Sequence, residues 1–151
     1  MTKRAESGLG LIEAIVSLAM MSAVMVTIGS LFVVGQQQLK SGRTSTEALS
    51  VAQSILETME GWGFGETYSR FGYDGTATSY TVDSRTNGAA AAWQTALSGK
   101  LRGGYATIQL ASLASGTPPA MTGASAIRVT VTIVWSERDR SRTIRLATVK
   151  M

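Results

Sequence analysis

The chain has 151 residues, which is enough for one domain and a short appended segment. It contains no cysteine and no histidine, so disulfides, thiolate metal sites, cysteine nucleophiles and histidine acid–base catalysis are excluded. The formal net charge of +4 is a mild basic excess, typical of a solvated surface, and does not by itself predict nucleic-acid binding. We therefore expect a protein without catalytic activity and without a cofactor.

The first predicted element is a long apolar helix near the N-terminus. Residues 14–35 contain no charged residue, and their polar residues are small: Ser17, Ser22, Thr27 and Ser30. A helix of this length spans roughly 30 Å, the thickness of the hydrocarbon core of a bilayer. A buried core helix is the alternative, but no other segment is long and apolar enough to surround one. Because Lys3 and Arg4 precede the apolar run, a cytoplasmic N-terminus and an exported C-terminal part are predicted.

A cleaved secretory signal is a second interpretation of the same segment. The basic start suits such a signal. However, the apolar region of a secretory signal has about 7–15 residues and ends at a small-x-small cleavage site. This run is longer and continues into GQQQLKSGRTSTEAL without such a site, so a membrane-spanning helix is favoured.

Glu13 stands at the start of the apolar segment, where lipid disfavours a charge. A carboxylate at this depth costs on the order of a few kcal/mol, and it is a functional-site hypothesis by default. As a lone interfacial anchor it would be stabilised by the helix dipole. That alternative explains neither Gly8 and Gly10 nor the short polar leader before them.

The stretch Gly8-Leu9-Gly10-Leu11-Ile12-Glu13 resembles the class III signal of type IV pilins and pseudopilins. The charged leader, residues 1–8, and the apolar run after Glu13 are similar to that family as well. The resemblance implies that a prepilin peptidase cuts between Gly8 and Leu9 and methylates the new amino group of Leu9. It also implies that Glu13 pairs with the N-terminal amine of a neighbouring subunit, so that a charge costly in lipid is compensated in a helix bundle.

Two positions depart from the family pattern. Gly10 stands where Thr or Ser is commoner, which should not prevent cleavage, and Ser30 stands where major pilins usually carry a helix-kinking proline. The missing proline favours a minor pilin or a pseudopilin, and GLGLIEAIVSLAM is most similar to the V-type minor pilins of type IV pili and to the I-type minor pseudopilins of type II secretion. Because certain tip subunits of the family lack the acid, the presence of Glu13 implies a position beneath another subunit.

The resemblance implies a minor pilin, a structural subunit of a pilus filament, or alternatively a minor pseudopilin of a type II secretion system. Its partners would be other major and minor pilins or pseudopilins, the prepilin peptidase, the inner-membrane assembly platform with its motor, and membrane lipid before assembly. The precursor would lie in the bacterial inner membrane, and the assembled filament in the periplasm or at the cell surface. A single-span, membrane-anchored exported binding protein is the alternative from another class. An exported hydrolase is disfavoured, because no residue spacing suggests one.

After the apolar segment the polarity changes but helical spacing continues over residues 36–60. Apolar residues recur at steps of three and four, with further apolar residues beside them: Leu49, Ala52, Leu56 and Met59, then Val51 and Ile55. The glycines of EGWGFGE, residues 60–66, end the pattern. We predict one helix from about Leu9 to Glu60, with 9–35 in the membrane or filament core and 36–60 lying on a small domain.

Residues 61–151 predict a β-rich head and hence an α+β fold, in which the helix lies on a small antiparallel sheet as in pilins. Residues 79–84 and 104–113 read as strands, and 114–125 as a loop broken by Pro118 and Pro119. Residues 89–101 fit either a short helix or a loop with an alanine tract. The clearest signal is a C-terminal hairpin with a turn at 136–141, because apolar residues alternate along both strands: Ile127, Val129, Val131, Ile133 and Trp135, then Ile144 and Leu146.

Three further features of the head could form a site. Asp74 and Asp83 lie in a Gly-rich stretch, but a Ca²⁺ ion needs six or more oxygens and no dense acidic cluster is present. The glycines of residues 61–65 resemble a phosphate loop, yet they follow a helix and lack a lysine, so a connection carrying two aromatic side chains into the core is favoured. The arginines of the hairpin could meet DNA or an acidic partner, but a solvated face is the favoured interpretation: Arg138, Arg140, Arg142 and Arg145.

Overall fold

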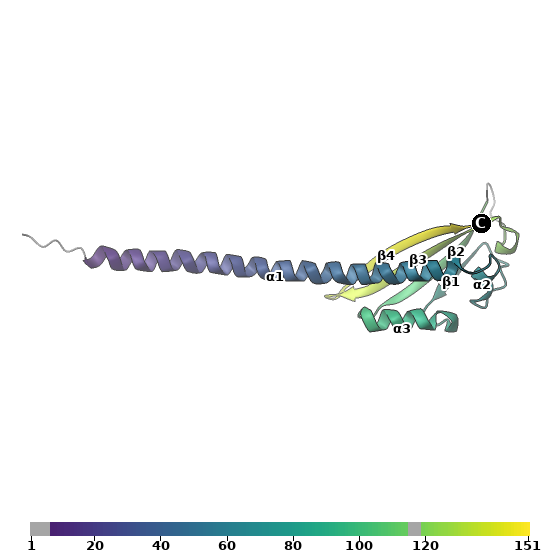
Figure 1. The fold of residues 1–151 in the computed structure, drawn as a ribbon, viewed down its shortest axis with the longest axis horizontal. Coiled ribbons are helices and arrows are strands. Elements are labelled where there is room, and N and C mark those ends of the chain that lie inside the picture. The colour runs from purple at the N-terminus through teal and green to yellow at the C-terminus, as the bar shows by residue number, and fades with distance from the viewer. Residues whose placement is uncertain (1–6, 115–118) are drawn as a thin grey trace, which may run out of the picture. The chain divides into compact units, whose positions relative to one another are not determined.

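A computed structural model describes the backbone of residues 7–114 and 119–151, and the side chains of these ranges from Gly10 onward. The chain forms two compact units, Met1–Ser41 and Gly42–Met151. The first helix, α1 (Ser7–Glu60), contributes residues to both units (Figure 1). The predicted start at Leu9 was thus two residues late, and the predicted end at Glu60 is confirmed.

The N-terminal unit is the first part of α1. Every side chain from Gly10 to Lys40 is exposed. No proline interrupts the helix, and its glycines do not end it, because isolated glycines cost only about 1 kcal/mol each relative to alanine. The expected continuity through Ser30 is therefore confirmed.

In the C-terminal unit, the second part of α1 buries one face in the core. Ala48, Ala52 and Ile55 are completely buried, and Val51 and Met59 are nearly so. These positions recur at steps of three and four and so form one stripe of the helix. The predicted stripe was partly wrong, because Leu49 is exposed and Leu56 only partly buried.

The sheet of this unit has four antiparallel strands in the order β1-β2-β3-β4. Its strands are β1 (Ser79–Asp83), β2 (Tyr105–Leu113), β3 (Ala126–Glu137) and β4 (Arg140–Lys150). The longest ladder joins β3 and β4, from Ile127 opposite Lys150 to Glu137 opposite Arg140. The α+β fold predicted for the chain is confirmed.

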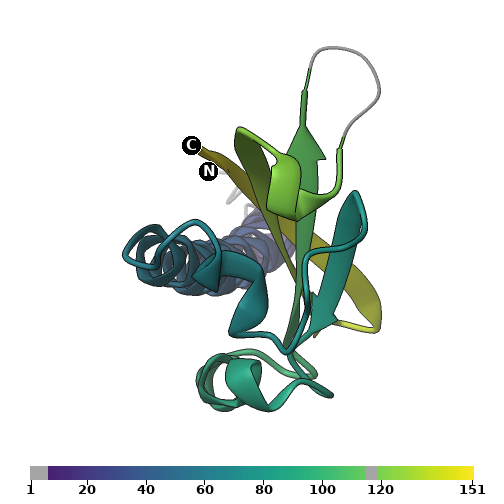
Figure 2. The same ribbon diagram turned by 90° about the vertical axis from the view of Figure 1, so that its right-hand side faces the viewer.

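One face of the sheet is covered and the other is open, as the alternating sequence of β3 predicted. Alternate residues from Ile127 to Trp135 are buried, whereas the residues between them are exposed or partly buried. Figure 2 shows α3 (Ala91–Lys100) and the C-terminal part of α1 on the same side of the sheet. This arrangement leaves the opposite face without a helix among the described residues.

Residues 91–100 form the helix α3, which decides the alternative that the sequence left open. A buried polar network ties α3 to the sheet. The Ser84 hydroxyl donates to Gln94 Oε1 (2.5 Å) and accepts the Ala106 N–H (2.9 Å), while Gln94 Nε2 donates to the Gly104 carbonyl (3.0 Å). Ser84 is buried, so each of these groups must find a partner within the protein.

Short elements that the sequence did not predict complete the unit. A single helical turn, α2 (Glu66–Ser69), follows α1, and 3-10 turns occupy Gly88–Ala90 and Met121–Gly123. The hairpin turn is tighter than expected, because strand pairing continues as far as Glu137 and Arg140. Arg138 and Asp139 both have positive φ, 51° and 61°, as the two central residues of a type I′ turn require.

Candidate assembly and membrane site

The structure places Gly8, Leu9 and Glu13 in the first turns of α1. The side chain of Leu9 lies outside the described residues. Leu9 and Glu13 are four residues apart, so they lie on the same side of the helix about 6 Å apart along its axis. The Cβ of every helical residue tilts toward the N-terminus, which directs the Glu13 side chain toward the level of Leu9. A carboxylate is thus set beside the position where cleavage after Gly8 would create an amine.

Glu13 is an isolated charge. It is the only charged residue between Ser7 and Leu39, and its side chain is exposed. It makes no hydrogen bond or ion pair with any residue that the structure describes. The carboxylate is therefore available to a cation outside the described part of the chain.

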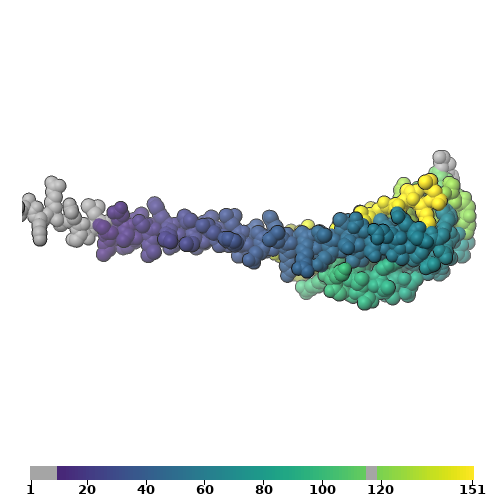
Figure 3. Space-filling model, viewed as in Figure 1, coloured from purple at the N-terminus to yellow at the C-terminus, as the bar shows by residue number. Residues whose placement is uncertain are grey.

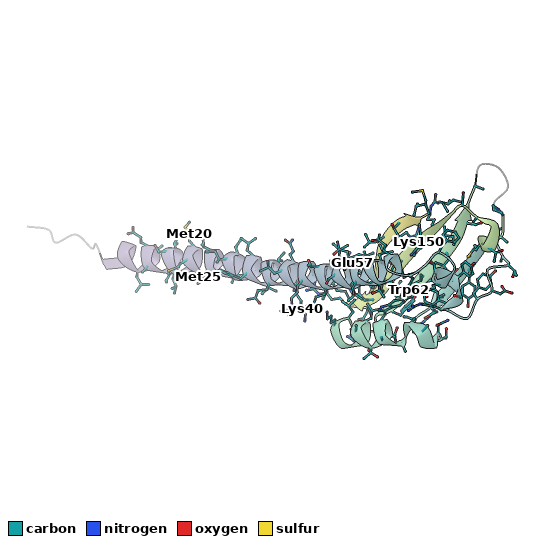
Figure 4. All side chains as sticks on the ribbon, turned by 45° about the vertical axis from the view of Figure 1, so that its right-hand side comes forward. Met20, Met25, Lys40, Glu57, Trp62 and Lys150 are labelled. Atoms are coloured by element: carbon teal, nitrogen blue, oxygen red, sulfur yellow. The ribbon has the colours of Figure 1, made fainter. Side chains whose placement is uncertain are left out.

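Apolar side chains surround the first part of α1 on all faces. Met20 is 68 % exposed and Met25 58 %, and both side chains point away from the helix (Figure 4). Successive residues such as Ile15 and Val16, or Leu31 and Phe32, point in different directions and are exposed as well. A helix that is apolar all round is stable only when lipid or other protein surrounds it. Figure 3 shows this segment in purple and blue as a single rod of side chains.

Three hydroxyl groups of this segment are hydrogen-bonded within the helix. Ser22 donates to the Leu18 carbonyl (2.8 Å), Thr27 to that of Ala23 (2.9 Å) and Ser30 to that of Val26 (2.9 Å). Each bond runs to the residue four positions earlier, the pattern that Ser and Thr adopt inside helices. These donors therefore require no water and suit a lipid environment, where an unpaired polar group is costly.

Among the described residues, one helix is long and apolar enough to cross a membrane, and it comprises Gly10–Glu60. None of its most apolar stretch is buried against the protein. Because the stretch is neither covered by protein nor interrupted by charge, it is compatible with a membrane anchor.

The acidic residues weighed as Ca²⁺ ligands have other partners. Asp74 accepts the Thr76 hydroxyl (2.8 Å) and the Thr76 N–H (3.1 Å), and these bonds hold the pKa of the Asp74 carboxyl below its ordinary value. Asp83 is bound by the Arg85 guanidinium (2.5 Å), whose hydrogen bonds lower the pKa of the Asp83 carboxyl. No three His, Cys, Asp or Glu side chains gather as metal ligands in the described part of the chain.

The glycine-rich connection after α1 does not present a free anion cradle. Gly63 donates its N–H to the Glu66 carboxylate (2.8 Å), and this bond is the main reason why the pKa of the Glu66 carboxyl is lowered. The aromatic side chains of Trp62 and Phe64 pack against the core. Trp62 also stacks on Trp93, with ring centroids 6.0 Å apart. The expectation that this connection carries two aromatics into the core is confirmed.

One important residue was missed by sequence reasoning. Lys150, near the end of β4, directs its Nζ at the C-terminus of α1 and donates to the carbonyls of Met59 (2.8 Å), Glu60 (3.1 Å) and Trp62 (Figure 4). The last carbonyls of a helix lack partners within the helix and carry its negative dipole end. A cation there both completes their hydrogen bonds and offsets that charge. No local pattern around Lys150 could have predicted this, because its partners lie about 90 positions earlier.

Comparisons of the chain with protein-family models, with curated proteins and with solved structures give no match.

Proposed function

We propose that this protein is a minor type IV pilin, a non-catalytic structural subunit that waits in the membrane and then enters a filament. The observation that carries the proposal is the beginning of α1. There the carboxylate of Glu13, which has no partner among the described residues, follows a Gly8-Leu9 bond and begins a stretch of helix that is apolar on every face. Cleavage at that bond would leave an amine on Leu9, and the amine of one subunit would neutralise Glu13 of the next.

The architecture supports the same proposal. An apolar helical segment with three internally bonded hydroxyls suits both lipid and a bundle of like helices. The remaining part of the helix packs its buried stripe into the hydrophobic core of an α+β unit. A minor pseudopilin of a type II secretion system would use the same assembly chemistry and is the first alternative. A single-span anchored binding protein would need the span but neither the cleavage nor the acid.

The mature N-terminus separates these possibilities. Mass spectrometry of the protein purified from its native membrane should show a chain that begins with N-methylated Leu9. A chain that still carries its initiator methionine would overturn the pilin proposal in favour of an uncleaved anchor. A Gly8→Val variant, whose bulkier side chain hinders a protease at that bond, should accumulate as the uncleaved precursor.

The role of Glu13 is tested by removing its charge at constant shape. Glu13→Gln should lower incorporation into sheared filaments at least about tenfold, because the neighbouring amine then lacks its counter-ion in a low-dielectric bundle. Membrane levels of the precursor should not fall. Glu57→Gln removes another exposed carboxylate, from the second part of α1, and should leave incorporation unchanged. Normal incorporation of the Glu13→Gln protein would contradict the proposal. Co-purification with pilus or with secretion components then distinguishes a pilin from a pseudopilin.

A further inference from the structure

We propose that the outer edge of β4 is a docking strand for an acidic, extended segment of a partner protein, which would join the sheet as a fifth strand. The proposal concerns the C-terminal unit alone. It does not rest on the function proposed for α1, so either can fail without the other.

The two edges of the sheet differ in what they offer. β1 has five residues, and the chain just before it is already engaged, since the Met121 N–H donates to the Ala77 carbonyl (3.2 Å). β4 has eleven residues, and apart from its ladder with β3 its backbone bonds to no other described backbone. Figure 1 shows β4, in yellow, at the margin of the sheet. In an antiparallel ladder every second residue directs its N–H and C=O away from the neighbour, so β4 presents a row of unpaired donors and acceptors.

The positive charge of the chain is concentrated at this edge. Residues 126–151 carry six basic and two acidic residues, while the other 125 residues carry eight of each. The whole net charge of +4 therefore belongs to the β3–β4 hairpin. β4 itself has four basic residues and no acidic one: Arg140, Arg142, Arg145 and Lys150.

Two of these cations are free to receive a partner. Lys150 caps α1, and Arg142 is paired with Glu137 (3.2 Å). Arg140 and Arg145 are exposed and form no ion pair with a residue that the structure describes. They are five positions apart, so they lie on opposite faces of the sheet. A complementary strand would need two acids an odd number of positions apart, one for each face.

The same charges indicate which occupant the edge accepts. A second copy pairing antiparallel through β4 would bring the two sets of arginines together, and like charges on adjacent strands are destabilising. Charged edge strands protect against such self-association. An acidic strand meets no such repulsion and gains both backbone hydrogen bonds and ion pairs. The edge therefore favours an acidic strand over a second copy of this chain because of its charge.

The test uses the full chain in detergent and a fluorescent ten-residue peptide of alternating threonine and valine with two glutamates five positions apart. The peptide should bind about tenfold tighter than its lysine counterpart, as two cross-strand ion pairs of about 0.7 kcal/mol each would give. N-methylation of alternate amides along one edge of the peptide should weaken binding at least about tenfold, while methylation along the other edge should not. Bound peptide should slow amide hydrogen exchange in residues 140–150.

Matched variants locate the site. Arg140→Gln combined with Arg145→Gln should remove most of the preference for the acidic peptide. Arg102→Gln, which removes an exposed cation between α3 and β2, should change the affinity less than twofold. Absence of saturable binding, or equal weakening by both methylation patterns, would overturn the proposal. Binding of a single-stranded DNA oligomer through the same arginines, together with an N-methylated peptide that binds unchanged, would instead identify a general polyanion surface and would also overturn it.

Discussion

At the scale of single residues, Gly75 lies where the side chains of Tyr68 and Thr122 come close to its backbone. Its φ of +78° lies in the region that residues with a Cβ rarely adopt. A Cβ at this position would lie 2.7 Å from Cε2 of Tyr68 and 2.9 Å from Cγ2 of Thr122. The Thr122 N–H also donates to the Gly75 carbonyl (3.2 Å). Conformation and space thus both require glycine here.

Gly75→Ala should lower the free energy of unfolding by about 2–4 kcal/mol, the sum of a left-handed residue and a local clash. Gly72→Ala is the matched control. Gly72 has almost the same φ, +76°, but an added Cβ would meet nothing within 4 Å, so only about 1 kcal/mol should be lost. Denaturant unfolding monitored by tryptophan fluorescence measures both. Equal losses in the two variants would show that the contacts with Tyr68 and Thr122 carry no cost.

At the scale of the elements, the end of α1 and the end of β4 stabilise each other through Lys150. Lys150→Met keeps the length of the side chain but leaves the carbonyls of Met59, Glu60 and Trp62 without this donor. We expect the unfolding free energy to fall by about 1–2 kcal/mol, the range for a favourable charge at a helix C-terminus together with its hydrogen bonds. Hydrogen exchange in residues 56–60 should accelerate, because the last turn of the helix frays more readily.

Lys100→Met provides the control for that substitution. Lys100 is an exposed lysine in the last turn of α3 and makes no hydrogen bond to a described residue. Its replacement should change the unfolding free energy by no more than about 0.5 kcal/mol, as surface substitutions usually do. A Lys150→Met protein as stable as Lys100→Met would mean that the cap contributes nothing.

The hairpin turn is an element whose sequence is not the one that its backbone favours. Type I′ turns prefer Asn-Gly or Asp-Gly, because both central residues have positive φ, but here they are Arg138 and Asp139. Asp139→Gly should therefore stabilise the C-terminal unit by about 0.5–1 kcal/mol, which a rise in melting temperature would reveal. Asp139→Ala should have the opposite sign, since alanine gains nothing at this φ and loses the tolerance of aspartate for it. A melting temperature lowered by the glycine would contradict this account.

The elements also show what could be predicted from the sequence. Long, uniform patterns predicted α1 and the β3–β4 hairpin: an apolar run followed by a period of 3.6 residues for α1, and a period of 2 for the hairpin. The face of α1 was less well predicted: Leu49 fits the apolar pattern yet is exposed, while Ala48 is completely buried. Direction explains the difference: Ala48 lies on the buried stripe with Ala52, whereas Leu49 lies about 100° further round the helix, and the apolar pattern alone does not say which of the two adjacent positions faces the core. Glu13 can be named as a candidate from the sequence because it is an acid beside an apolar run, and its role stays a prediction. The Lys150 cap depends on tertiary contacts, so no local pattern reveals it.

For the molecule as a whole, the carboxyl groups determine how the free energy of unfolding depends on pH. The chain has no histidine, and among the described residues the carboxyl groups with a lowered pKa are Glu66, Asp74 and Asp83, all in the C-terminal unit. A carboxyl with a lowered pKa in the folded state contributes stability that is fully present above its unfolded pKa and is lost as the pH falls through the folded value. We therefore expect the free energy of unfolding to be nearly constant from pH 8 to about 5 and to decline below about pH 4.

Asp83→Asn tests the origin of that decline. At neutral pH the variant should be less stable than the parent, because Arg85 loses its carboxylate partner while the amide keeps the shape of the side chain. Below the folded pKa the parent carboxyl is protonated as well, so the difference between the two proteins should shrink steadily as the pH falls from about 4 to 2. Urea unfolding at a series of pH values and constant ionic strength measures the difference. A difference that stays the same at every pH would mean that the Asp83–Arg85 pair does not contribute to the acid sensitivity, and that the decline arises from other carboxyls.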